Sequence, residues 1–199
     1  MTRIILLRSC STDFDDEGRI KGTLDIPLNK KGNQEAVQAA SDMAEQADDI
    51  AVVYYSPYQA AEQTAEVVAV KLGIKARPLK TLQNLDHGLW QGMLIEELKE
   101  KQKKVYRQWQ EQPETVCPPE GETVTVTLIR VKTSLDKLIK KHKNTTIVLV
   151  APEPLTSLIR SYLEQSELGD LWETTNECGS WLVVDVEPKR LAAMAANQT

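Results

Sequence analysis

The stretch Arg3-Ile-Ile-Leu-Leu-Arg8 decides the fold, because it is apolar at every internal position and an arginine closes each end. Two further stretches, Ala51–Ser56 and Thr146–Ala151, have the same nearly continuous apolar character, and Trp181–Val186 repeats it near the end of the chain. Strands that do not alternate apolar and polar residues are usually covered on both faces, as in a mostly parallel sheet. These runs therefore predict the strands of such a sheet.

The segments between the apolar runs have the 3.6-residue period of amphipathic helices. The four apolar stripes are Ala36, Ala40, Met43 and Ala47; Ala61, Ala65, Val68 and Leu72; Leu128, Val131, Leu135 and Leu138; and Leu155, Leu158, Ile159 and Tyr162. Thr123–Thr127 alone could equally be a strand, and Pro154 marks the start of the fourth helix. The alternation predicts a three-layer α/β/α sandwich with a mostly parallel central sheet. We expect residues 1–199 to form a single domain.

Composition narrows the classes of partner and compartment. The net charge of −5 argues against nucleic acid or an anionic membrane as the main partner. The apolar runs are too short to cross a membrane, and the first of them is too short for a signal peptide. The three cysteines, Cys10, Cys117 and Cys178, are odd in number and lack zinc-ligand spacing. We expect reduced thiols, no metal and a cytoplasmic location.

Ligands of such sheets bind beyond the carboxyl ends of the strands. That rule points to the segments that follow three of the predicted strands, Arg8–Asp16, Ser56–Ala60 and Ala151–Pro154. We expect a pocket where these segments meet.

Six segments carry a recognisable pattern, in this order: Leu6–Thr12, Gly18–Leu28, Ser56–Ala65, Leu82–Gly92, Pro119–Glu122 and Val148–Arg160. The first stands where the histidine phosphatase superfamily has Leu-x-Arg-His-Gly-Glu-Thr, and the second resembles its Gly-Arg-x-Gln-Gly-x-x-Asp-x-Pro-Leu loop. The others are similar to its Ser-Pro-Leu-x-Arg-Ala-x-Gln-Thr-Ala, Gly-x-Trp-Glu-Gly, Pro-x-Gly-Glu and strand–His-Gly-Gly–helix segments. The resemblance to this superfamily, which includes the cofactor-dependent phosphoglycerate mutases, implies a phosphoglycerate mutase-like fold.

The resemblance also implies where phosphate chemistry would be found. In the family a histidine attacks the phosphoryl group, a second histidine and two arginines hold its oxygens, and a glutamate protonates the leaving oxygen. The corresponding positions are Ser9 for the nucleophile, Pro152 for the second histidine, Arg8 and Ala60 for the arginines, and Asn84 for the acid. Of these five, Arg8 alone keeps the family's residue.

The replacements remove the chemistry that the family uses. A serine needs an adjacent general base before it can attack, and the sequence offers none beside Ser9. Ala60 has no side-chain donor, and the Asn84 amide cannot give up a proton near neutral pH. Pro152 has neither a side-chain donor nor a backbone N–H.

Other residues near the expected pocket carry charge or a reactive atom. Asp15 replaces the family's asparagine and Asp16 follows it, while Glu153 replaces a glycine. Each carboxylate would repel a phosphate dianion by about 1 kcal/mol in a wet cleft. Cys10 and His87 are further candidates for the pocket lining, although each has a simpler packing role open to it.

We therefore predict a catalytically inactive member of the fold, a pseudophosphatase that acts as a binding or regulatory module. Its partner would be an unidentified protein or small molecule, with no cofactor, no nucleic acid and no membrane, and a homo-oligomer stays open. The alternative is a phosphatase or mutase-like enzyme that acts on a small phosphorylated metabolite by altered chemistry. A purely structural subunit of an oligomer is a third reading.

Overall fold

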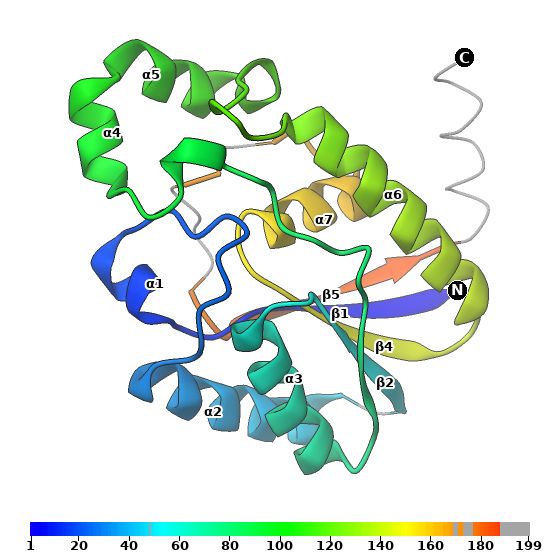
Figure 1. Cartoon of the computed structure of the whole chain (residues 1–199). Coiled ribbons are helices and arrows are strands. Elements are labelled where there is room, and N and C mark those ends of the chain that lie inside the picture. Colours follow the sequence, from blue (N-terminus) through cyan, green and yellow to red (C-terminus); the bar gives the residue numbers. More distant parts are fainter. Residues whose placement is uncertain (48, 169–170, 173–176, 188–199) are drawn as a thin grey trace.

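A five-stranded sheet forms the centre of the molecule in the computed structural model, which describes residues 1–47, 49–168, 171–172 and 177–187. The strands are β1 (Thr2–Arg8), β2 (Ile50–Tyr55), β3 (Ala76–Pro78), β4 (Thr146–Ala151) and β5 (Trp181–Val186). Their order is β3-β2-β4-β1-β5, with β5 antiparallel to β1 and the other neighbours parallel (Figure 1). The prediction of a mostly parallel sheet is confirmed.

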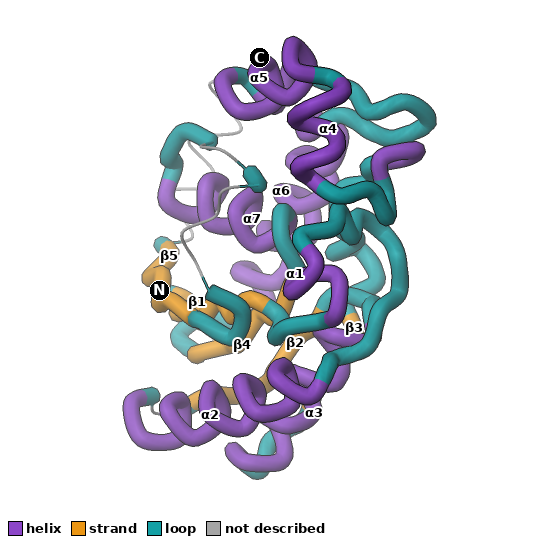
Figure 2. Tube along the Cα trace, turned by 90° about the vertical axis from the view of Figure 1, so that its left-hand side faces the viewer, coloured by secondary structure: helices purple, strands orange, loops and turns teal. Residues whose placement is uncertain are grey.

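Helices cover both faces of this sheet. They are α1 (Asp13–Glu17), α2 (Lys30–Gln46), α3 (Gln59–Leu72), α4 (Ile95–Lys101), α5 (Lys103–Glu111), α6 (Val124–Lys141) and α7 (Leu155–Glu164), with short 3₁₀ helices at Gly88–Trp90 and Pro113–Thr115. Helices α2 and α3 lie on one face, whereas α6 and α7 lie on the other (Figures 1 and 2). The predicted three-layer sandwich is confirmed.

Strand β1 shows why the apolar runs lack alternation. Ile4 and Leu6 pack in the core cluster that contains α6 and α7, while Ile5 and Leu7 pack in the cluster that contains α2 and α3. All four side chains are at most 1% exposed. Because successive side chains of a strand point to opposite faces, a strand buried on both faces is apolar at every position.

A third apolar cluster lies beyond the carboxyl ends of the strands, where α4 and α5 stand apart from the sheet (Figure 1). Its centre is the pair Trp90 and Trp109, whose ring centroids are 5.9 Å apart in an edge-to-face arrangement. Ile20, Leu85 and Leu171 pack around them. This cluster builds an apolar wall opposite the end of the sheet.

Some local features differ from the sequence patterns. Thr123–Thr127 is not a strand: Thr123 caps α6 by accepting a hydrogen bond from the Val126 N–H. Helix α7 begins directly after Pro154, as expected. The three-residue strand β3 and the short helix α1 were not predicted. Throughout the described ranges, every helix is too short or too polar to cross a membrane.

Candidate functional site

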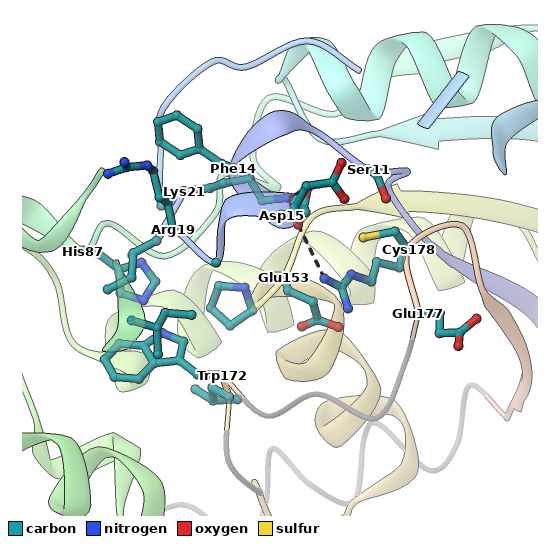
Figure 3. Close-up of a pocket in the computed structure, with 18 of the residues that line it drawn as sticks. Ser11, Phe14, Asp15, Arg19, Lys21, His87, Glu153, Trp172, Glu177 and Cys178 are labelled. Carbon is teal, nitrogen blue, oxygen red and sulfur yellow. Dashed lines mark hydrogen bonds and ion pairs between the residues drawn. The ribbon is translucent and has the colours of Figure 1, made fainter. Parts of the chain in front are cut away.

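A cavity of about 610 Å³ opens at the carboxyl ends of β1 and β4, between α1 and the apolar wall (Figure 3). Its described lining has a polar part and an apolar part. The polar and charged residues are Arg8, Ser11, Asp15, Asp16, Arg19, Lys21, Lys31, Glu35, His87, Glu153, Glu177 and Cys178. Phe14, Ile20, Ile95, Leu171 and Trp172 supply most of the apolar lining.

The register of β1 and β4 places the first two site residues. Arg8 at the end of β1 pairs with Ala151 at the end of β4, and the Ser9 N–H donates to the Ala151 carbonyl oxygen at 2.8 Å. Glu153 follows β4 by two residues, so it enters the cavity from the same edge of the sheet as Arg8. This is the edge at which parallel sheets bind ligands.

Asp15 lies at the centre of the charged part. Its carboxylate accepts hydrogen bonds from Lys21 Nζ at 2.7 and 2.8 Å, and Oδ1 is 3.6 Å from the Arg8 guanidinium. The Thr12 backbone N–H and hydroxyl also donate to it, at 2.8 and 2.7 Å, within a capping box that starts α1. Burial alone would raise the pKa of Asp15, but Lys21 and Thr12 outweigh it and hold the pKa below its usual range.

Lys21 reaches the site from the loop between α1 and α2. Its segment is fixed by backbone hydrogen bonds in both directions: the Ile20 N–H donates to the Met93 carbonyl at 3.0 Å, and the Gly92 N–H to the Ile20 carbonyl at 2.8 Å. Sequence reasoning missed Lys21. The signal was present, because Lys21 stands where the related loop motif has glutamine.

Glu153 is the second carboxyl group in the charged part. Its Oε2 accepts a hydrogen bond from the Ser157 N–H at 3.2 Å, while Oε1 is buried and has no hydrogen-bond partner in the described residues. Burial raises the pKa of Glu153, although the charges of Arg8 and Lys21 and the Ser157 hydrogen bond partly oppose it. Asp15 and Glu153 therefore favour opposite protonation states.

A second group of charged residues holds the loop after β1 against α2. Glu35 accepts hydrogen bonds from both the N–H and the hydroxyl of Ser11, each at 2.8 Å. Lys31 lies 3.6 Å from Glu35 and 3.4 Å from Asp16. Gly32 permits this approach, because a Cβ there would overlap the Ser11 carbonyl oxygen. These contacts hold the loop after β1, which carries part of the site, against α2.

His87 lines the opposite part of the cavity and packs with the apolar wall (Figure 3). Its ring lies 5.5 Å from that of Trp109, between centroids. Burial lowers its pKa to about 4, so the imidazole is neutral near pH 7. The segment of His87 packs closely against the loop that contains Gly121. Gly88 and Gly121 permit this close approach, because a Cβ at either position would overlap the backbone of the opposite segment. Sequence reasoning included His87 as a candidate, and the structure places it in the lining.

The other positions that the resemblance implied are buried outside the described lining. Ser9 directly follows β1 and Pro152 directly follows β4, and both are buried. Ala60, the second residue of α3, packs in one cluster with Cys10. Burial raises the pKa of the Cys10 thiol to about 12, which makes it unreactive. Asn84 is fully buried and bridges three backbone groups. The structure therefore places Arg8, Asp15, Glu153 and His87 in the lining of one cavity. The described lining does not include Ser9, Cys10, Ala60, Asn84 and Pro152.

The geometry favours an anion at the charged part and an uncharged group beside the wall. Arg8 and Lys21 are two cations aimed at one place, where the Asp15 carboxylate now neutralises part of their charge. A group with a lowered pKa and one with a raised pKa in the same cavity is typical of acid–base chemistry. Within the described ranges, no cluster of three or more histidine, cysteine or acidic side chains could hold a metal ion.

Comparison with known proteins agrees with the fold. Residues 4–199 match the model of the histidine phosphatase superfamily, branch 1. Phosphoserine phosphatase 1 of Hydrogenobacter thermophilus is 29% identical over 100% of this chain and 93% of its own length. A metal-independent phosphoserine phosphatase of Arabidopsis thaliana is 28% identical over 75% of this chain and 63% of its own. A mycobacterial glucosyl-3-phosphoglycerate phosphatase, solved with vanadate, has a TM-score of 0.81 at 21% identity over 92% of this chain and 90% of its own.

These relatives contradict the prediction of a catalytically inactive binding module. They carry the names of phosphatases, and one of them aligns with the whole chain. The prediction was wrong because it took Glu153 only as a charge that repels phosphate and missed Lys21, whereas the cavity holds both residues beside Arg8. The comparisons favour the alternative, an enzyme that acts on a phosphorylated compound.

Proposed function

Because the chain belongs to the histidine phosphatase superfamily, branch 1, we propose that it hydrolyses a small phosphate monoester by chemistry altered from the family's own. The observation that carries the proposal is the pair of cations at the end of β1. Arg8 and Lys21 converge on one carboxylate at 3.6 and 2.7 Å, in side chains that are 13% and 10% exposed. Largely buried cations placed around the phosphate oxygens are the main requirement for phosphoryl transfer.

In this proposal Arg8 and Lys21 bind the phosphate oxygens and stabilise the charge that develops on them. Asp15 keeps the two cations oriented while the site is empty, and the incoming phosphate competes with its carboxylate. Since Asp15 is also fixed by Thr12, it stays next to the phosphate and limits its affinity. The enzyme would bind phosphate product weakly, which favours product release.

Water is the attacking group that best fits the described lining. Ser9 lies outside it, and burial raises the pKa of the Cys178 thiol, so that a thiolate is disfavoured. The Ser11 hydroxyl donates to Glu35. The water oxygen forms a bond to phosphorus as the bond from phosphorus to the ester oxygen breaks. The products are the alcohol and inorganic phosphate.

The organic part of the substrate would lie against Phe14, Ile20, Ile95 and Trp172. A cavity of about 610 Å³ is much larger than a phosphate group needs and falls in the range of small-molecule sites. An ester with an apolar or aromatic alcohol would bury this surface. The proposed substrate class is therefore a phosphate monoester with a largely apolar alcohol.

Release of inorganic phosphate from a panel of monoesters tests the proposal, with phenyl phosphate and O-phosphoserine as the extremes of alcohol polarity. We expect turnover above a buffer blank, faster with phenyl phosphate, and a loss of about 100-fold in Arg8→Gln and in Lys21→Gln. Lys99→Gln on exposed α4 is the matched control and should keep full activity. No turnover with any ester, or turnover that both cavity variants retain, would exclude the proposal.

A further inference from the structure

Glu153 has a buried carboxyl oxygen in the cavity with no hydrogen-bond partner among the described residues. Oε2 accepts from the Ser157 N–H, whereas Oε1 is buried without a hydrogen-bond partner in the described residues. An ionised oxygen buried in this way loses its hydration without gaining a hydrogen bond in exchange. A protonated Oε1 would instead present an O–H, and that donor needs an acceptor that a ligand in the cavity can supply.

The charges around Glu153 come from several elements. The titratable side chains that share the cavity with it are Arg8 on β1, Asp15 and Asp16 on α1, Arg19 and Lys21 in the following loop, Lys31 and Glu35 on α2, His87 before the first 3₁₀ helix, and Glu177 and Cys178 before β5. Arg8 and Lys21 favour the ionised form of Glu153, but burial outweighs them and its pKa is raised. A bound phosphate would neutralise those two cations and add negative charge, which raises the pKa further.

Asn84 ties the backbone of Glu153 into place. Its Nδ2 donates to the Glu153 carbonyl at 3.0 Å and to the Gly22 carbonyl at 2.8 Å, and its Oδ1 accepts from the Leu155 N–H at 3.2 Å. A fully buried amide with three partners fixes the start of α7 against the loop that carries Lys21. Asn84 stands at the position where the resemblance implied the acid. Its side chain instead hydrogen-bonds the backbone of Glu153, a different acidic residue.

We propose that Glu153 is the proton donor of the reaction and that Asn84 is the residue that positions it. The inference rests on the proposed function and adds one step to it. The Oε1 proton passes to the ester oxygen while the bond from phosphorus to that oxygen breaks, so that the leaving group departs as a neutral alcohol. Glu153 becomes a carboxylate and regains a proton that the attacking water releases, which leaves the alcohol and hydrogen phosphate as balanced products.

A series of leaving groups tests the assignment, because a proton donor matters only when the alcohol is a poor leaving group. In Glu153→Gln we expect kcat/KM for phenyl phosphate to fall by about 100-fold or more, since general acid catalysis contributes about that much. For 4-nitrophenyl phosphate, whose leaving group needs no proton, we expect a fall of less than about tenfold. Glu164→Gln, which removes an exposed carboxylate at the C-terminal end of α7, the helix that follows Glu153, should change neither value.

The pH profile gives an independent measurement. Wild-type kcat for phenyl phosphate should fall as the pH rises through the pKa of Glu153, and Glu153→Gln should lose this dependence. Asn84→Ala should lower kcat more than it changes KM and should show the same leaving-group selectivity. Combined with Glu153→Gln, it should add little, because the two residues act through one group. Glu153→Asp, which keeps a carboxyl group, should recover part of the activity toward phenyl phosphate.

Two results would overturn the inference, and they are distinguishable. A wild-type enzyme that turns over both esters, with a Glu153→Gln variant that slows both equally, would leave the proposed function intact and assign Glu153 a structural role. A folded wild-type protein that hydrolyses neither ester would overturn the proposed function and this inference together. Circular dichroism of each variant separates these outcomes from loss of folding.

Discussion

Asp15→Asn should strengthen the binding of phosphate. The carboxylate lies 2.7 Å from Lys21 Nζ and 3.6 Å from the Arg8 guanidinium, so an anion held by both cations must approach it closely. At about 5 Å, with an effective dielectric constant of about 40–80 in a wet cleft, a carboxylate opposes a phosphate dianion by about 2–3 kcal/mol. Removing that charge should tighten phosphate binding by about 30- to 150-fold.

Isothermal titration calorimetry with inorganic phosphate and with vanadate, at pH 7 and low ionic strength, measures this change. Asparagine can still accept a hydrogen bond from the Thr12 N–H, so we expect the variant to fold, but it leaves two largely buried cations without their carboxylate, at a stability cost of about 3 kcal/mol. Asp16→Asn is the matched control: its carboxylate is 46% exposed and pairs with Lys31, and its loss should change affinity by less than about threefold. Unchanged or weaker binding in a folded Asp15→Asn protein would refute the electrostatic reasoning.

Two further predictions concern stability. Trp109→Ala removes a fully buried ring from the apolar wall and should destabilise the fold by about 3–5 kcal/mol. The expected drop in Tm in a thermal melt is about 10 °C. A drop below about 3 °C would mean that the wall contributes little to stability. Glu153→Gln should raise Tm at pH 7–8, because a folded-state pKa above the unfolded value costs stability as pH rises through the window between the two. At about pH 4 the carboxyl is largely protonated in both states, so the two melts should converge; a variant that melts lower at pH 8 would contradict the raised pKa.

Much of the fold could be predicted because a strand that is buried on both faces has a continuous run of apolar residues in the sequence. Strands β1, β2 and β4 are inner strands and have continuous apolar runs. The three residues of β3 are too few to show any pattern, and two of them are exposed. Nothing in Trp181–Val186 distinguishes an antiparallel edge strand from a parallel one, because that difference depends on the path of the preceding chain. Thr123 reads as part of a strand until its capping hydrogen bond to α6 is seen.

The site was less predictable, because which side chain enters a cavity depends on loop geometry. Arg8, Asp15 and Glu153 were found through their nearness to strand ends. Ser9 and Asn84 stand near the same strand ends or loops, yet their backbones turn them into the interior. Lys21 and Trp172 come from segments with no strand beside them, and only the folded chain brings them to the cavity.

The close approach of the segments around Gly88 and Gly121 has a consequence for local opening. The Leu89 N–H donates to the Pro119 carbonyl at 2.9 Å, and the Glu122 N–H donates to the Asp86 carbonyl at 2.9 Å, so each segment protects an amide of the other. The side-chain pair Glu122 and Arg130, at 2.7 Å, anchors them to α6. If both amides become exposed only when the two segments separate, Leu89 and Glu122 should show one common free energy of opening in hydrogen–deuterium exchange. The stretch that carries His87 would thus fluctuate in step with a loop more than thirty residues away in the chain, as one cooperative unit.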